Sequence, residues 1–276
     1  IWNEGKYKTH TFSLLDMNFA FITKDSKILS DLSRLSASQK FKFEDAISSG
    51  IKYSFLFNNQ NKPKVKNPTF LNIKGWLIGA SALTAKALGL EERDVTTNAI
   101  TLAGIRYATF FKVQGDIRKF YNFINEQQIA FRTLAGAGIP MDEDGVIPFD
   151  QLYFVGGANS LRGWRRRTLG PGSYFNSSDN VDKLGEINLE LSAEYRFPVT
   201  SILKGALFVD AGNVWTQKPN PDSGLYGSKD FKFGRFYKEM AVSPGVGFRL
   251  DFDFFLFRVD LGIPVKQAYN PNIWKL

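Results

Sequence analysis

The feature that most constrains this chain is a strict alternation of apolar and polar residues in its second half. In residues 186–197 every second side chain is apolar, and the side chains between them are polar or charged. The same period of two returns over 203–215, 241–252 and 255–263. Successive side chains of a strand point to opposite faces, so each segment is predicted to be a β-strand with one apolar and one polar face. The polar faces carry charges of both signs: Glu190, Glu194, Arg196, Asp210, Arg249, Asp251, Arg258 and Asp260.

Five further strands are predicted in the first half, which brings the total to about nine. They are expected over residues 11–23, 51–58, 70–81, 106–122 and 126–139. In the fourth of these, Tyr107, Phe111 and Ile117 share the apolar face, while Lys112 and Asp116 share the polar one. Long loops are expected over 24–46 and 82–105, with short helical stretches near Ile28–Leu35 and Leu83–Leu90.

Alternation alone is also typical of a soluble β-sandwich, which is the commoner architecture. Three features favour a membrane barrel instead: the strands are long for a soluble sheet, short turns alternate with long loops, and aromatic residues gather near strand ends. A charged side chain that faces lipid is costly, so the charged faces are expected to line the lumen. The predicted fold class is therefore all-β, an antiparallel transmembrane β-barrel of which this chain supplies a part. The aromatic residues expected to point outward near strand ends are Tyr195, Phe197, Trp215, Phe252 and Phe255.

Composition narrows the possible chemistry. The chain has no cysteine, which excludes disulfides and thiol chemistry, and no apolar run of about 18 residues that could form a membrane helix. The net charge of +8 is scattered along the sequence, which argues against a nucleic-acid partner. His10 is the only histidine, expected at an exposed strand end, so a Ser-His-Asp triad or a histidine metal cluster is not predicted. Asp142, Asp144 and Gly145 resemble the start of a calcium loop, but the later ligands are missing. Neither enzymatic activity nor a cofactor is predicted.

One long segment, residues 140–185, has no sustained period, and a loop of that length is usually functional or disordered. At its centre lies the stretch Phe154–Trp164, where glycines surround one arginine and two large apolar side chains. A phosphate-binding loop is not predicted, because Gly-Lys-Ser/Thr is missing and no helical period follows. An ordinary glycine-rich surface loop remains open on local grounds. The residues singled out are Gly156, Gly157, Leu161, Arg162, Gly163 and Trp164.

The order of five motifs resembles the C-terminal barrel of BamA/TamA-type outer-membrane assembly factors, the bacterial surface antigen superfamily. The motifs are VGGANSLRGW, LSAEYRFP, FVDAGNVW, SPGVGFRLDF and FRVDLGIP. The stretches Ser49–Ser54 and Asn58–Gln60 look most like Bacteroidetes members. In this family the Arg-Gly loop folds back into the lumen, so the resemblance implies that Arg162 pairs with Glu194 and Asp210 on the two following strands.

The resemblance implies that the protein assembles or inserts outer-membrane β-barrel proteins through a lateral seam that templates client strands. It further implies outer-membrane lipid and client barrel proteins as partners, accessory assembly lipoproteins as possible ones, and the bacterial outer membrane as the location. A passive pore or secretion channel on a related barrel stays open as the alternative. The sequence does not distinguish a BamA-like role from a TamA-like role.

The chain also departs from the family pattern. About nine strands are predicted where a family barrel has about sixteen, so this chain alone is not expected to close. It begins at Ile1 with no methionine, and Trp274-Lys275-Leu276 lacks the terminal strand pattern. Residues 1–276 are therefore expected to be the C-terminal barrel portion of a longer protein, without the periplasmic repeats and the first strands.

Overall fold

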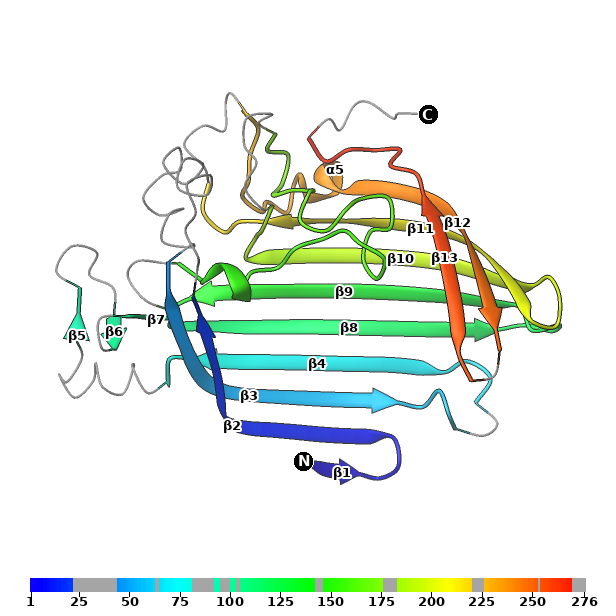
Figure 1. The fold of residues 1–276 in the computed structure, drawn as a ribbon, viewed down its shortest axis with the longest axis horizontal. Coiled ribbons are helices and arrows are strands. Elements are labelled where there is room, and N and C mark those ends of the chain that lie inside the picture. Colours follow the sequence, from blue (N-terminus) through cyan, green and yellow to red (C-terminus); the bar gives the residue numbers. More distant parts are fainter. Residues whose placement is uncertain are drawn as a thin grey trace.

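A computed structural model describes residues 1–21, 44–62, 65–80, 92–94, 100–102, 105–141, 146–175, 183–219, 226–252 and 254–269. These residues form a single sheet of thirteen strands (Figure 1). Nine strands have seven or more residues, which agrees with the predicted number. They are β2 (Lys8–Ala20), β3 (Ala46–Asn58), β4 (Thr69–Ile78), β8 (Phe110–Asn122), β9 (Gln128–Pro140), β10 (Ile187–Pro198), β11 (Leu203–Trp215), β12 (Ala241–Asp251) and β13 (Leu256–Gly262).

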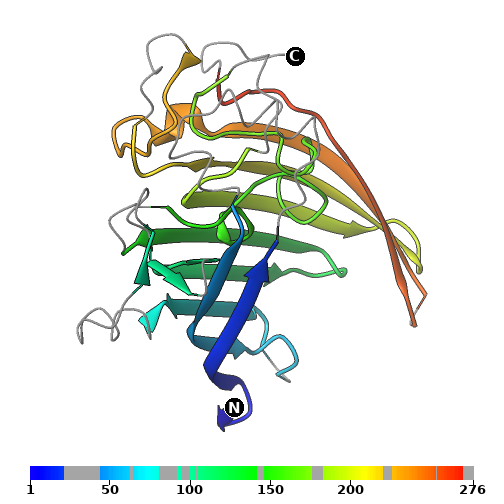
Figure 2. The same cartoon turned by 60° about the vertical axis from the view of Figure 1, so that its left-hand side comes forward.

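The nine long strands pair antiparallel with their sequence neighbours, from β2 at one side to β13 at the other. The sheet curls, so that β13 crosses in front of β9, β10 and β11 in the view of Figure 1. Figure 2 shows the concave side, where the segment between β9 and β10 lies against the strands. Within the described residues the sheet does not close on itself.

Four short strands and two helical turns complete the described structure. They are β1 (Trp2–Glu4), β5 (Glu92–Arg93), β6 (Ile100–Leu102), β7 (Ile105–Tyr107), the 3-10 turn Phe149–Gln151 and α5 (Phe236–Glu239). In the part of the chain that is described, no helix is long and apolar enough to cross a membrane.

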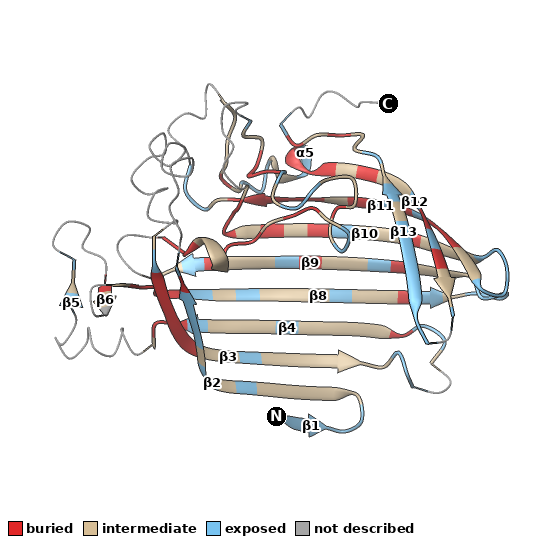
Figure 3. Ribbon diagram, viewed as in Figure 1, coloured by how far each residue is buried: buried red, intermediate tan, exposed pale blue. Residues whose placement is uncertain are grey.

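In the long strands charged side chains are buried and large apolar side chains are exposed, which is the reverse of a soluble protein. Glu190 and Asp210 are only 7% and 1% exposed, whereas Leu207 and Phe257 are 51% and 55% exposed. The alternation of buried and exposed positions along the strands is visible in Figure 3. Apolar side chains therefore point outward and charged ones inward, as predicted for strands that cross a lipid bilayer. This arrangement excludes the soluble sandwich, in which the apolar faces would meet in the core.

The predicted strand over residues 106–122 was wrong at its start. β7 pairs in parallel with β3, through Ala46 and Arg106, and only β8 joins the antiparallel series. Tyr107 is consequently buried against Ile47 and Ile100 and does not face outward. A period of two shows which side chains share a face, but it carries no information about which strand edge a segment will pair with.

Three other expectations need correction. Trp215, expected among the outward aromatic residues near strand ends, is 0% exposed, and its Nε1 donates to Glu239 Oε2 at 2.7 Å. β3 begins at Ala46, five residues before the predicted start, because residues 46–50 are buried on both faces and the consecutive polar residues Ser48 and Ser49 interrupt the apolar alternation there. His10 is not exposed at a strand end: its ring stacks on Trp2 and its Nδ1 lies 2.8 Å from the Tyr53 hydroxyl. The helical stretches near Ile28–Leu35 and Leu83–Leu90, the calcium-like residues Asp142, Asp144 and Gly145, and the terminal Trp274–Leu276 lie outside the described residues.

Candidate functional site

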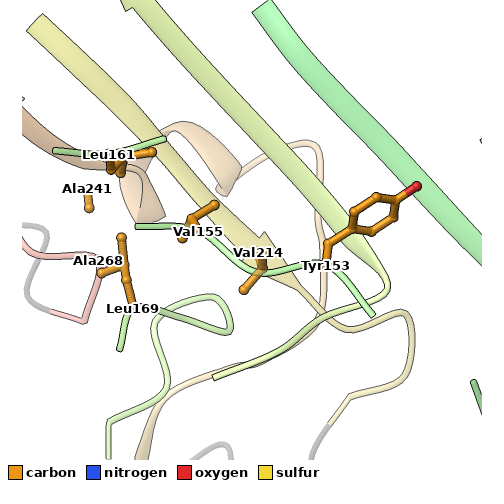
Figure 4. Packing of buried hydrophobic residues seen from close by; sticks show 7 residues of the cluster. All are labelled: Tyr153, Val155, Leu161, Leu169, Val214, Ala241 and Ala268. Carbon is orange, nitrogen blue, oxygen red and sulfur yellow. The ribbon is translucent and has the colours of Figure 1, made fainter. Parts of the chain in front are cut away.

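The segment between β9 and β10 is packed against the concave side of the sheet. Its entry and exit are joined by two backbone hydrogen bonds between Tyr153 and Gly185, at 2.9 and 3.0 Å. Its apolar side chains form a buried cluster with residues of β11, β12 and the chain after β13 (Figure 4). A glycine-rich surface loop would not possess such a core, so that reading is wrong. The cluster comprises Tyr153, Val155, Leu161, Leu169, Val214, Ala241 and Ala268.

Gly156 and Gly157 permit the sharp turn at the start of the motif. Their φ angles are +97° and +98°, a region that residues with a side chain rarely adopt. A Cβ on Gly156 would also collide with the carbonyl oxygen of Arg165, which runs alongside. The turn is closed by the Gly156 amide, which donates to Ser160 Oγ at 2.9 Å, and by the Gly157 amide, which donates to the Trp164 carbonyl at 2.8 Å.

The tip of the loop sits directly on the strand backbones. Leu161 is 1% exposed and fills the space above Gly212, where a Cβ would come within 3.0 Å of its methyl group. A Cβ on Gly262 of β13 would lie 2.7 Å from the amide nitrogen of Gly163. Small residues on β11 and β13 thus allow the loop backbone to approach the wall more closely than side chains would permit.

Arg162 forms the polar centre of the site. Its Nε and Nη2 donate to the two oxygens of Asp210, both at 2.8 Å, and its Nη1 donates to Glu194 Oε2 at 2.7 Å. Its backbone amide also donates to Asp210, at 3.2 Å. The predicted contacts with both acids are therefore present, and the planar guanidinium is what allows one side chain to bridge two carboxylates.

Several residues that the sequence analysis did not assign complete this arrangement. The guanidinium carbon of Arg162 lies 3.3 Å from the centroid of the Phe208 ring. Ser192 Oγ donates to Asp210 Oδ1 at 2.8 Å, and Asp260 Oδ2 lies 3.6 Å from Arg162 Nη1. Phe208, Ser192 and Asp260 all lie on the inward face of their strands. The period of two assigns them to that face, but it gives no reason to select them from the other inward residues.

Electrostatics favour the charged form of this arginine. Burial opposes ionisation, but the hydrogen bonds and charges of Asp210 and Glu194 outweigh it and raise the pKa of Arg162 above its ordinary value. Its side chain is 7% exposed, so the pair is shielded from solvent screening. Removing one partner of such a buried pair leaves an uncompensated charge, at a cost of about 2–4 kcal/mol.

The six motif residues and the two acids are thus brought together at one place. Gly156 and Gly157 shape the turn, Leu161 and Gly163 contact the wall, and Trp164 packs against the apolar cluster while its amide donates to the Leu161 carbonyl at 3.1 Å. The arrangement holds a loop against the lumen side of the strands. Among the described residues, no group of three or more His, Asp or Glu side chains could hold a metal ion.

Comparison with known proteins agrees with this architecture. The family model of the Omp85 superfamily domain matches residues 15–273. The outer membrane protein assembly factor BamA of Neisseria meningitidis serogroup B is 30% identical over 114 residues, which cover 36% of this chain and 14% of that protein. The crystal structure of BamA from Haemophilus ducreyi lacking POTRA domains 1–3 has a similar fold, with a TM-score of 0.57 and 19% identity.

That structural match covers 87% of this chain and 43% of the Haemophilus ducreyi chain, so the chain spans less than half the length of the relatives it matches. The family model nevertheless covers almost the whole sequence. The chain therefore belongs to the Omp85 superfamily of bacterial outer-membrane β-barrel proteins.

Proposed function

We propose that residues 1–276 act as the C-terminal barrel portion of a factor that inserts β-barrel proteins into the outer membrane. The single observation that carries the proposal is the buried Arg162 with its two carboxylates, which docks the loop on the lumen side of the wall. A loop that fills the lumen suits an assembly factor better than a passive channel, because a channel needs an open path. Membership of the Omp85 superfamily supports the same choice.

In this proposal the docked loop keeps the wall in the shape that a client strand meets at the lateral seam. The seam would offer unpaired backbone groups to the client, and edge pairing would template its strands one after another. The partners would be client β-barrel proteins and outer-membrane lipid, with accessory lipoproteins on the full-length protein.

The test is Arg162→Ala in the full-length protein. We expect a folded barrel, because the strand ladder does not involve this side chain, and a loop that trypsin cleaves faster at the exposed Arg165 and Arg166. Insertion of client barrels into liposomes should fall several-fold. Arg162→Lys should restore it only in part, since an ammonium cannot bridge two carboxylates with the geometry of a planar fork.

Arg165→Ala is the matched control, because it removes an exposed arginine three residues away, and it should leave insertion unchanged. Unchanged client insertion in Arg162→Ala, combined with a rise in ion conductance, would contradict the proposal. That outcome would identify the protein as a channel whose loop closes the pore.

A further inference from the structure

A cavity of about 390 Å³ lies between the loop tip at Ala158–Arg162 and the inner faces of β8 to β13. It sits toward the end of the wall where the connections are short, at 122–128, 198–203 and 251–256. Its volume is within the range of small-ligand pockets. Six arginines line it: Arg118, Arg132, Arg162, Arg196, Arg249 and Arg258.

Four of these arginines face one another in like-charged cross-strand pairs. Arg118 is the direct partner of Arg132 across β8 and β9, and Arg249 is the direct partner of Arg258 across β12 and β13. Like charges directly opposite each other destabilise a sheet. Two such pairs on the walls of one cavity point to a requirement for positive charge at that place.

The carboxylates in contact with these arginines are too few to neutralise them. Asp116 is shared by Arg118 and Arg132, and Asp260 is shared by Arg258 and Arg162. Glu194 forms ion pairs with Arg162, Arg196 and Arg249. Asp210 forms an ion pair with Arg162. Six guanidinium groups therefore meet four carboxylates. Glu190 also attracts Arg132 electrostatically, but the six arginines still outnumber the carboxylates when it is included.

Arg249 also has hydrogen-bonding capacity to spare. The residue is 8% exposed, and its Nη2 donates to Glu194 at 2.6 Å. Its Nη1 is buried and makes no hydrogen bond with any residue that the structure describes, and the same holds for the two oxygens of Asp260, which attracts Arg249 electrostatically. A buried charged donor without a partner is costly, so a group that accepts from it would be bound with a gain in free energy.

We propose that this cavity binds an oxyanion, a carboxylate or phosphate group that reaches the lumen from the short-turn end of the wall. In outer-membrane barrels the short turns face the periplasm, so the ligand would be a water-borne anion or an acidic peptide segment from that compartment. Guanidinium groups bind such oxygens in a planar fork. The cavity shares Arg162, Glu194 and Asp210 with the docking of the loop, but anion binding there does not depend on the proposed assembly function.

A substitution at Asn159 can place a negative charge inside the cavity in the absence of any ligand. Its Oδ1 accepts a hydrogen bond from Arg258 Nη2 at 2.9 Å, and its backbone carbonyl accepts one from Arg132 Nη1 at 2.6 Å. Asn159→Asp would place a carboxylate between these two arginines with almost no change of shape. The variant should raise the apparent melting temperature and weaken the binding of an external anion, a combination that misfolding cannot produce.

The experiment is isothermal titration of the full-length protein in detergent micelles, with chloride adjusted to constant ionic strength. The probes are inorganic phosphate and a tetra-aspartate peptide. We expect saturable binding at one site in the wild type. Binding should be about tenfold weaker in Arg249→Gln, which loses one charge-assisted hydrogen bond. It should be weakened to a similar extent in Asn159→Asp, because the new carboxylate competes with the anion for Arg258 and repels it. The control Arg165→Gln changes the net charge equally, but outside the cavity, and should bind like the wild type.

Tighter binding of tetra-aspartate than of phosphate would identify an acidic peptide as the ligand, and similar or weaker binding would identify a small free oxyanion. The proposal is overturned if neither probe binds saturably, or if Asn159→Asp and Arg249→Gln bind as the wild type does. Loss of anion binding with client insertion unchanged would leave the assembly proposal intact, so the two can fail independently.

Discussion

At the scale of single residues, the site depends on the absence of side chains as much as on the charge of Arg162. The loop tip can reach its carboxylates only because Gly212 and Gly262 leave room for Leu161 and for the backbone of Gly163. The charged contacts and the close backbone contacts therefore stabilise the same docked position. Each is expected to weaken when the other is lost.

This coupling predicts the effect of Gly262→Ala. The new Cβ would lie 2.7 Å from the Gly163 nitrogen and 2.9 Å from the Arg162 carbonyl carbon, so the loop backbone must move. We expect a loss of about 1–3 kcal/mol of local docking free energy, seen as faster trypsin cleavage within the loop of the folded protein. Gly75→Ala on β4 is the matched control, since nothing lies within 4 Å of the added atom. Equal cleavage rates for the two variants would show that the close contact does not hold the loop.

At the scale of elements, each long strand separates two environments. β11 exposes Val209 outward near its middle, while the neighbouring Asp210 is 1% exposed and holds Arg162. In a protein dissolved in water, arginine at a position that is 46% exposed would be nearly neutral. The same change on a strand surrounded by lipid is not neutral, because the charge must enter hydrocarbon.

Val209→Arg is therefore expected to destabilise the folded protein in lipid bilayers by about 2–4 kcal/mol. The measurement is denaturant-induced unfolding in liposomes, followed by tryptophan fluorescence. Lys204→Arg, on the same strand, keeps its charge and serves as the control. A stability change below about 0.5 kcal/mol for Val209→Arg would mean that this face does not meet lipid.

At the scale of the whole molecule, the described sheet has unpaired edges. β13 pairs only with β12, and the opposite side of the long-strand series ends at β2 with its short partner β1. Unpaired edges expose backbone donors and acceptors that cannot be left without partners in lipid. The described sheet on its own therefore leaves backbone groups unpaired along its edges.

We expect residues 1–276, expressed alone and reconstituted into liposomes, to give no client insertion above the background of protein-free liposomes. The physical reason is that edge strands in lipid would pair with one another between copies and not with clients. Folding gels and client protection from protease would measure the result, with the full-length protein as the positive control. Efficient insertion by this segment alone would show that the seam needs no further strands.

The sequence by itself determined the strand class and the orientation of the strand faces, because a period of two assigns every side chain to one of two sides and a bilayer tolerates charge on only one of them. It also indicated Arg162, Glu194 and Asp210, through the resemblance of their motifs. Only the tertiary structure decided that β7 pairs in parallel with β3, that Phe208 lies under the guanidinium, and that six arginines surround one cavity. These features depend on contacts between residues far apart in the chain, which a local pattern does not encode.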